Sequence, residues 1–212
     1  MDEKALIAAL EQVSSATLHE TMGKRHTMQS CVQPLWRPLT ICGPAFTVQA
    51  RPADNLATHW GVAVAPAGSV LVVSHEADNT CGGWGEILSV ASQARGLKGL
   101  VTDGAVRDTV ACRQLGFPIF SQGVAIKGTS KSYPGAVNVP VVCAGVTVYP
   151  GDYIVADDDG IVVIPRDQAE EILTQGRQRD EREAEIMAQL RGGALTIDLL
   201  NLRDKLPGLA DN

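Results

Sequence analysis

Short valine-rich runs recur along the chain, and turns that contain glycine or proline separate them from short amphipathic segments. Such runs lie at residues 41–50, 70–74 and 99–102, and three shorter ones lie between 137 and 165. Valine and isoleucine favour strands, and strands that alternate with helical segments are typical of parallel sheets with helical crossovers. We therefore expect an α/β fold, a compact sandwich of mixed sheets with some parallel and some antiparallel strands.

Amphipathic helices are predicted between these runs. Residues 3–13 place their apolar side chains on one helical face, and Ser14 or Ser15 is the expected N-cap of a second helix. A later helix begins at Glu86, and Gly96 ends it. Its apolar side chains follow the i, i+3, i+4, i+7 spacing and are expected to face the core: Ile87, Val90, Ala91 and Ala94.

The composition fits one domain with a helical arm. Of the 212 residues, 45% are hydrophobic and only 4% are aromatic, so the core should consist mainly of Val, Ala, Leu and Ile. Residues 1–166 form the predicted α/β domain. The arm, residues 167–212, begins with a long helix over 167–191 that is too polar for a core. We expect the arm to pack on a neighbouring subunit, and the alternative is a solvated helix.

Charge and hydropathy exclude several classes of protein. The formal net charge is −6, which argues against a general nucleic-acid-binding protein. No stretch approaches the roughly 18 apolar residues of a membrane helix, and the charged N-terminus does not look like a signal peptide. The five scattered cysteines form no C-x-x-C pair and are typical of reduced, buried thiols. We expect a cytoplasmic protein without nucleic-acid or membrane partners.

Residues 81–108 carry the strongest functional signal. Three glycines, Gly82, Gly83 and Gly85, precede the helix that begins at Glu86. A glycine loop at a helix N-terminus can direct backbone N–H groups toward an anion, such as a carboxylate or a phosphate. The alternative is that these glycines only permit a tight turn into the helix.

Arg107 and Asp108 follow the predicted strand 99–102, and the glycine loop follows the strand 70–74. Ligands bind at the carboxyl ends of strands in open α/β sheets, so the two segments should meet at one edge. Arg107 suits a carboxylate or an enolate oxygen, Asp108 can hold Mg²⁺ or Mn²⁺, and Glu86 can orient a water or take a proton. The alternative is an Arg-Asp pair that only caps the following helix.

Other candidate sites are weaker. His59 and His75 are expected to be surface or packed histidines rather than catalytic bases. The sequence ADDDG at 156–160 lacks the ligand pattern of an EF-hand calcium loop and is typical of a hairpin turn. The polar sequence GTSKSYPG at 128–135 is a candidate lid or subunit contact. Nucleotide cofactors are not expected, because no G-x-G-x-x-G or P-loop motif occurs.

Several separated segments together resemble the RraA-like family, which includes a regulator of ribonuclease E activity and the 4-hydroxy-4-methyl-2-oxoglutarate aldolases. They are WGEILSVASQARGLKGLVTDGAVRD, GTSK, VNVPVVCAGVTVYPGD and ADDDGIVVIP, with SSATLHETMGKR and ICGPAFTV before them. The resemblance covers about residues 14–200, with its motifs in order. It implies a β/β/α swivelling-domain sandwich that assembles as a homotrimer or as a hexamer, a dimer of trimers.

The resemblance also implies class II aldolase chemistry, in which a divalent metal and an arginine stabilise the enolate of pyruvate. The aldolases carry an acid, twenty further residues and then Arg-Asp, a spacing that Glu86, Arg107 and Asp108 meet. The acid is Glu here, where the well-known aldolases have Asp. By resemblance, Asp108 binds Mg²⁺ or Mn²⁺, Arg107 holds pyruvate, and the substrate carboxylate contacts the backbone of Gly82, Gly83, Trp84 and Gly85.

A glutamate from a neighbouring subunit completes the family's site. Counting back from LTIDL assigns this role to Glu183, with Glu185 as the other candidate. Ala111 stands where the aldolases often have a further acid, which leaves the substrate range open. We expect a metal-dependent lyase that cleaves 4-hydroxy-2-oxo acids, such as 4-hydroxy-4-methyl-2-oxoglutarate, to pyruvate and also decarboxylates oxaloacetate. The alternative is a non-catalytic RraA-like regulator that binds a ribonuclease.

Overall fold

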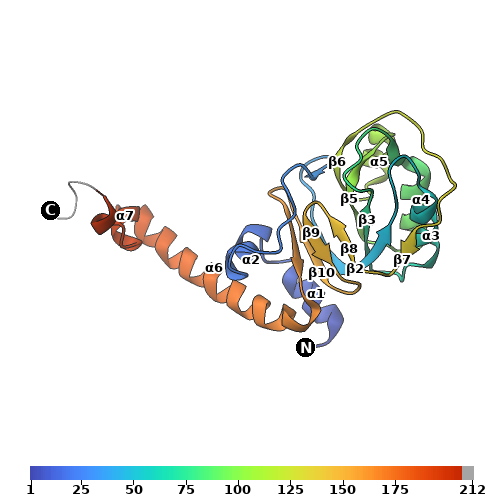
Figure 1. Cartoon of the computed structure of the whole chain (residues 1–212). Coiled ribbons are helices and arrows are strands. Elements are labelled where there is room, and N and C mark those ends of the chain that lie inside the picture. The colour runs from blue at the N-terminus through green and yellow to red at the C-terminus, as the bar shows by residue number, and fades with distance from the viewer. Residues whose placement is uncertain (207–212) are drawn as a thin grey trace.

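A curled, mixed sheet forms the centre of the molecule (Figure 1), which the computed structural model describes over residues 1–206. Along its main path the strand order is β1-β6-β5-β3-β2-β10-β11, and β4 pairs with β5 while β7 pairs with β2. The strands of this sheet are β1 (Gln33–Pro34), β2 (Ile41–Gln49), β3 (Val70–Ser74), β4 (Gly82–Trp84), β5 (Gly99–Val106), β6 (Ile119–Val124), β7 (Ala136–Val137), β10 (Tyr153–Ala156) and β11 (Ile161–Ile164). Strands β8 (Val141–Cys143) and β9 (Val146–Val148) pair with each other in a second sheet.

The middle of the large sheet is parallel. Strands β2, β3, β5 and β6 run in the same direction, and β3 pairs with β5 from Val70 opposite Gly99 to Val73 opposite Thr102. Three helices make the crossovers: α3 (Leu56–Val64), α4 (Glu86–Ala94) and α5 (Thr109–Leu115). Alternate strand residues such as Leu71 and Leu100 pack with side chains of these helices in one buried cluster. The strand-helix alternation predicted from the sequence is therefore confirmed.

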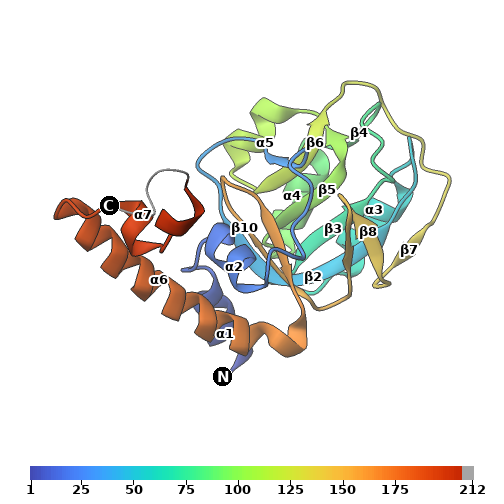
Figure 2. The same cartoon turned by 60° about the vertical axis from the view of Figure 1, so that its left-hand side comes forward.

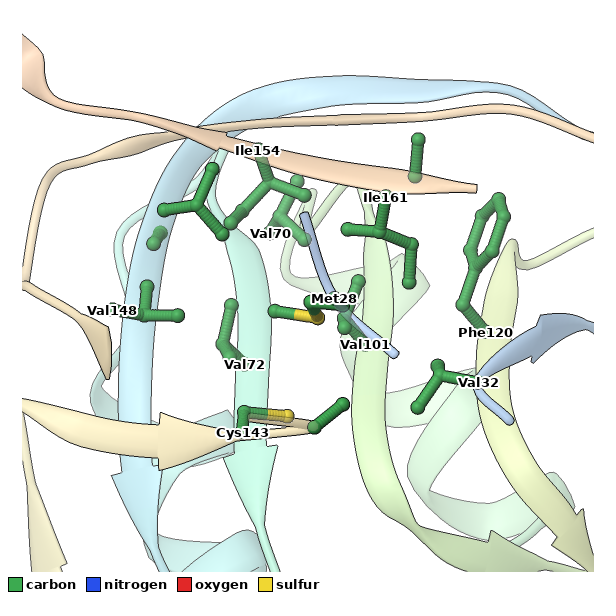
Figure 3. Close-up of a cluster of buried hydrophobic side chains, with 14 of the residues drawn as sticks. Met28, Val32, Val70, Val72, Val101, Phe120, Cys143, Val148, Ile154 and Ile161 are labelled. Atoms are coloured by element: carbon green, nitrogen blue, oxygen red, sulfur yellow. The ribbon is translucent and has the colours of Figure 1, made fainter. Parts of the chain in front are cut away.

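The other alternate residues of the parallel strands form a second core (Figure 3). Val72, Val101 and Phe120 meet Ile154 and Ile161 of the antiparallel β10–β11 hairpin, together with side chains of β8 and β9. Strand β2 joins these parts, because its first half pairs with β10 and its second half pairs with β3. The ADDDG turn of the hairpin lies between β10 and β11, as predicted.

A third buried cluster lies on the outer side of this hairpin. It contains side chains of β10 and β11, of α1 (Glu3–Leu10) and α2 (Ser15–Thr21), and of the first turns of α6 (Ala169–Arg191). The Ser14 side chain caps α2 by accepting a hydrogen bond from the Thr17 N–H at 3.1 Å. The structure thus selects Ser14 rather than Ser15 as the N-cap.

Helix α6 is as long and polar as predicted, but its first turns belong to the domain. Its buried residues are Ala169, Ile172, Leu173 and Gly176. Asp180 still accepts a hydrogen bond from the Thr17 hydroxyl of α2 at 2.8 Å, and beyond it the helix leaves the body of the molecule (Figures 1 and 2). The 3₁₀ turn η1 (Arg166–Gln168) precedes it, and α7 (Thr196–Leu199) and the 3₁₀ turn η2 (Arg203–Lys205) follow. The last part of the predicted arm, 207–212, lies outside the described residues.

Three local predictions are wrong. The glycine segment forms strand β4 rather than a loop, and β5 continues through Asp103 and Gly104 to Val106. Helix α4 does not bury the predicted face, because it buries Leu88, Ser89 and Ser92 and leaves Ile87 77% exposed. Ser89 can be buried because its hydroxyl accepts from the Trp84 indole N–H at 2.8 Å and donates to the Gly85 carbonyl at 3.0 Å.

Two general predictions are tested within residues 1–206. A membrane-spanning helix is absent from this part of the chain, since α6, which has the length to span a bilayer, is rich in charged residues. The cysteines are all free, and four of them are buried as predicted. Cys31 is exposed instead.

Candidate active site

Pairing of β4 with β5 brings the two predicted site segments together. Gly82 lies opposite Ala105, and Trp84 lies opposite Val106. The pairing continues past the end of β5, where the Arg107 N–H donates to the Trp84 carbonyl at 2.8 Å. Arg107 and Asp108 therefore lie beside the start of α4. The predicted convergence of these segments at one edge of the sheet is confirmed.

Gly82 and Gly85 are required by the close approach of the Arg-Asp pair. A Cβ added to Gly82 would lie 3.0 Å from Arg107 Cβ and 2.4 Å from the Ala125 carbonyl oxygen. A Cβ added to Gly85 would lie 2.3 Å from Asp108 Oδ2. Both glycines therefore make room for the site residues, and a tight turn is not their purpose.

Asp108 lies against the N-terminus of α4. Its Oδ2 accepts a hydrogen bond from the Glu86 N–H at 3.2 Å, and Arg107 Nε lies 3.6 Å from the same oxygen. Asp108 has φ +55° and makes no side-chain cap of its own helix α5. The alternative that the Arg-Asp pair only caps the following helix is therefore wrong. The Glu86 N–H at the start of α4 thus faces a carboxylate of the protein.

The donor atoms beside Asp108 fit a hard, strongly hydrated cation. Glu86 and Asp108 supply carboxylate oxygens, and both side chains reach solvent. Within residues 1–206 no three or more His, Cys, Asp or Glu side chains gather as a metal-binding group. Such a poor set of protein ligands suits Mg²⁺ or Mn²⁺, which keep several waters and need only one or two carboxylates.

A pocket of about 170 Å³ opens beside this cluster. Its walls come from the start of α3, the β4–α4 junction, the end of β5 and the segment after β6, with these lining residues: Asn55, His59, Gly82, Gly85, Ile87, Leu88, Arg107, Gly128, Thr129 and Lys131. The Arg107 guanidinium faces that last segment, since a Cβ on Gly128 would lie 3.8 Å from its Nη1. Larger hollows exist elsewhere, but this one contains the predicted arginine.

Two members of the predicted glycine stretch do not line the pocket. The Trp84 side chain is buried in the core, where its ring stacks on Phe117 at a centroid distance of 5.9 Å. The Gly83 carbonyl accepts from Asn55 Nδ2 at 3.0 Å. Only Gly82 and Gly85 of this stretch reach the pocket wall.

Asn55 is a pocket residue that sequence reasoning missed. It is 7% exposed, and its Oδ1 has no hydrogen-bond partner in the described structure. An Asn before a helix is typical of an N-cap, yet Asn55 makes no cap hydrogen bond to α3. A buried acceptor without a donor is costly, so Asn55 marks a position where a ligand or a water donates a hydrogen bond.

The polar segment 128–135 is attached to the start of α3. The Asp54 carboxylate accepts from the Ser130 hydroxyl at 2.5 Å and from the Ser132 and Tyr133 N–H groups at 2.7 and 3.2 Å. Burial alone would raise the pKa of Asp54, but these hydrogen bonds and one from Leu56 outweigh it and lower the pKa to about 2. Lys131 is thereby held at the pocket between two anchored residues.

The two candidate histidines differ in position. His75 is packed as predicted: it is 5% exposed, its Nδ1 lies 3.2 Å from Thr102 Oγ1, and burial lowers its pKa. His59, which was expected to be a surface or packed residue, lines the pocket beside Lys131. The sequence around His59 contains no pattern that predicts a pocket residue.

Glu183 lies far from the pocket within one chain. It pairs with Arg179 on α6 at 2.8 Å, and Arg179 also lies 3.9 Å from Glu20. Helix α6 is on the side of the molecule away from α3 and α4 (Figures 1 and 2). Glu185 lies on the same projecting part of this helix and is exposed.

Comparison with known proteins identifies the family. Residues 12–163 match the RraA-like family, described as Aldolase/RraA. The chain belongs to the RraA-like family. A solved structure of an uncharacterized protein from Pseudomonas syringae pv. tomato has a TM-score of 0.81 and 29% identity, covering 92% of each chain. The β/β/α sandwich expected of this family is thus the observed fold.

Two of the similar proteins carry different functional descriptions. A protein of Halalkalibacterium halodurans named "Putative 4-hydroxy-4-methyl-2-oxoglutarate aldolase" is 34% identical over 173 residues, which cover 82% of each chain. The structure of Streptomyces coelicolor RraAS2, described as an unusual member of the RNase ES inhibitor RraA protein family, has a TM-score of 0.79 and 34% identity. It covers 88% of this chain and 97% of its own.

Proposed function

We propose that the protein is a divalent-metal-dependent lyase that cleaves 4-hydroxy-2-oxo acids to pyruvate and decarboxylates oxaloacetate. The observation that carries this proposal is the meeting of Arg107, Asp108 and Glu86 beside a pocket whose charged lining residues are basic. Basic groups attract the carboxylate of an oxo acid, and the two exposed carboxylates beside them fit a hydrated cation. The aldolase names of several relatives support the same reaction.

Arg107 is the group placed to stabilise the enolate. Cleavage of the C3–C4 bond leaves an electron pair that moves to the 2-oxygen of the pyruvate fragment. The guanidinium lies at the pocket wall with its Nε 3.6 Å from Asp108 Oδ2, so it can donate to this oxygen as charge develops. Decarboxylation of oxaloacetate breaks the equivalent bond and forms the same enolate, so Arg107 serves both reactions.

Asp108 would hold Mg²⁺ or Mn²⁺ beside Glu86, whose backbone N–H donates to Asp108 Oδ2. The bound ion supplies electrostatic stabilisation of charge on the substrate oxygens. Glu86 orients the water that takes the proton of the 4-hydroxyl as the C3–C4 bond breaks. Decarboxylation needs no such proton transfer, because carbon dioxide leaves directly.

In this proposal Glu183 reaches the pocket from a neighbouring copy of the chain. Two observations support this arrangement: Glu183 lies on the part of α6 that leaves the body, and its side chain is 44% exposed. Exposed apolar side chains also lie on α4, on α5 and in the segment after β6: Ile87 at the pocket wall, Val110 and Ile126. A homotrimer or hexamer with shared sites would cover them.

The second candidate function is a regulator that binds a ribonuclease without catalysis. The likeness to RraAS2, at 34% identity over nearly all of that chain, favours it. The two functions differ in their need for the Glu86, Arg107 and Asp108 cluster, because a regulator has no use for an enolate-stabilising arginine.

Pyruvate release from 4-hydroxy-4-methyl-2-oxoglutarate and from oxaloacetate, with and without chelator, tests the proposal. Chelator should abolish both activities, and Mg²⁺ or Mn²⁺ should restore them. Arg107→Ala should lower both by about 10²–10³-fold, the usual effect of removing one oxyanion contact. Glu86→Gln should slow aldol cleavage more than decarboxylation. If both variants keep both activities within a few-fold of wild type, the site is not catalytic and the regulator is favoured.

A further inference from the structure

A second hollow, of about 580 Å³, lies on the face of the large sheet opposite α3 and α4. It shares no lining residue with the Arg107 pocket. One wall is formed near the carboxyl ends of the four parallel strands, and strands β8 and β9 contribute the other. Because ligands of open α/β sheets bind at the carboxyl ends of strands, this position is typical of a binding site.

Each parallel strand carries a polar residue near its carboxyl end, and all four residues line this hollow. They are Gln49 of β2, Ser74 of β3, Asp103 of β5 and Gln122 of β6. Two residues earlier, β3, β5 and β6 carry apolar side chains of the second core (Figure 3). Since side chains alternate along a strand, the polar row follows this core on the same face of the sheet.

A bulge in β5 positions the acidic member of this row. Asp103 and Gly104 together lie opposite Gln122, because the pairing of β5 with β6 shifts there by one residue. Bulges are frequent beside active sites, since they redirect a side chain. Asp103 is only 3% exposed and yet lines the hollow. A buried carboxylate is thereby directed at the cavity.

One oxygen of the Asp103 carboxylate has no good donor. Its Oδ1 accepts from the His75 N–H at 2.6 Å. Its Oδ2 lies 3.4 Å from the Ser74 hydroxyl oxygen, which is beyond the usual range of an O–H···O bond. The single proton of that hydroxyl is donated to the Val142 carbonyl at 2.7 Å. Because a buried acceptor without a donor is costly, Oδ2 marks a position for a ligand that donates hydrogen bonds.

The lining of this hollow is acidic and rich in acceptors. Its charged members are Asp103 and Glu76, none of the described lining residues is basic, and neither carboxylate forms an ion pair within residues 1–206. The Gln49 amide N–H donates to the Ala50 carbonyl at 3.1 Å, which leaves the amide oxygen available. The described chain contains no group of three metal-ligating side chains that would favour a metal ion here. A guanidinium, with five N–H donors and no acceptor, matches these acceptors.

We propose that this hollow binds the guanidinium group of a ligand, with Asp103 Oδ2 as its main acceptor. The proposal is independent of the lyase reaction, because the hollow lies outside the Arg107 pocket. The guanidinium can belong to a free small molecule or to an arginine side chain of a partner protein. A volume of about 580 Å³ is within the range of small-molecule sites and favours the free molecule.

Titration of the full chain with butylguanidinium and butylurea, followed by NMR, tests the proposal. The two probes have the same shape, but butylurea is neutral. Wild type should bind butylguanidinium at least about tenfold more tightly, since a hydrogen bond to a charged group is worth about one to two orders of magnitude. The backbone amide resonances of Gln49, Asp103 and Gln122 should shift on binding, because these residues line the hollow.

Asp103→Asn should abolish the preference for butylguanidinium, because asparagine loses the charge but keeps an oxygen for the His75 N–H. Glu76→Gln should weaken the preference. Asp159→Asn is the matched control, since Asp159 is an exposed acid of the hairpin turn outside the hollow, and it should bind both probes as wild type does. Gln122→Glu adds a carboxylate and should tighten butylguanidinium binding, so it tests the site even if Asp103→Asn does not fold.

A capped Gly-Arg-Gly peptide distinguishes the two sources of the guanidinium. Tighter binding of butylguanidinium than of the peptide supports a free ligand, whereas tighter binding of the peptide assigns the hollow to an arginine of a partner. Equal binding of butylguanidinium and butylurea by wild type, or an unchanged preference in Asp103→Asn, would overturn the proposal. A lack of pyruvate release bears only on the proposed lyase reaction, because the titration needs no turnover.

Discussion

At the scale of single residues, the site depends on small side chains as much as on charged ones. Asp108 can lie beside the start of α4 only because Gly85 has no Cβ, and Gly82 makes room for the Ala125 carbonyl and for Arg107. Gly85 has an extended backbone, with φ −167°, so alanine is allowed there by its dihedral angles. Only the Asp108 carboxylate therefore prevents a side chain at Gly85. Substitution by alanine, which adds a single methyl group, is enough to test this contact.

Gly85→Ala should displace Asp108 and lower kcat/KM for pyruvate release by about a hundredfold, since displacing catalytic groups by about 1 Å has effects of this size. The fold should remain, because the Asp108 side chain is half exposed and can rotate toward solvent. Gly123→Ala is the control, since a Cβ at Gly123 meets nothing within 4 Å. Steady-state kinetics and circular dichroism of both variants measure the effect. Wild-type activity in Gly85→Ala would show that the position of Asp108 is unimportant.

At the scale of elements, Asp54 joins two segments that are 76 residues apart in sequence. It is 2% exposed and accepts hydrogen bonds from the segment after β6 and from the first turn of α3. Asn55 and His59 follow on α3, and Lys131 lies on the other segment, so one carboxylate holds both sides of the pocket. These hydrogen bonds favour the ionised form of Asp54, which is why its pKa is lowered to about 2.

Asp54→Asn should lower the free energy of unfolding at neutral pH by roughly 1–3 kcal/mol, because its amide can replace only some of these acceptor bonds. A carboxylate with a lowered pKa stabilises the fold fully above its unfolded pKa of about 3.9. This contribution is lost as the pH falls through the folded value of about 2. The difference between wild type and variant should therefore shrink below about pH 4. Urea unfolding between pH 7 and pH 3 measures it, and a pH-independent difference would contradict this account.

At the scale of the whole molecule, the candidate site and the projecting helix lie at different ends. The pocket is beside α3 and α4, whereas Glu183 lies on the part of α6 that leaves the body (Figure 2). A single chain cannot join them without unfolding the third buried cluster, in which Ile172 and Leu173 of α6 are packed. Only a second copy of the chain can bring Glu183 to the pocket, which makes the arrangement testable by mixing subunits.

Arg107→Ala and Glu183→Ala should each be nearly inactive alone. Co-expressed in equal amounts, they should recover about a quarter of wild-type activity, because random assembly of a symmetric oligomer gives that share of sites with both residues intact. Glu185→Ala in place of Glu183→Ala is the control and should be active alone if Glu183 is the cross-subunit acid. Pyruvate release and light scattering measure activity and assembly. A monomer with full activity, or no recovery on mixing, would rule out a shared site.

Local patterns in the sequence were sufficient to predict the strand-helix alternation, the ADDDG hairpin and the long polar helix. They also predicted that residues 82–86 meet Arg107 and Asp108. Each of these depends on neighbouring residues or on the rule that strand ends share one edge. The buried face of α4 could not be predicted in this way. Ser89 is polar in the sequence and becomes a core residue because the Trp84 indole N–H and the Gly85 carbonyl pair with its hydroxyl in the folded chain.

The tertiary structure alone decided the composition of the pocket. Asn55, His59 and Lys131 have no motif in common, and each has an ordinary surface or capping interpretation in its own segment. They meet because Asp54 anchors the segment after β6 to the start of α3. Hydrophobic periodicity reports which way a side chain points along its own element, whereas a pocket depends on contacts between elements distant in sequence. Those contacts form only when the sheet is assembled.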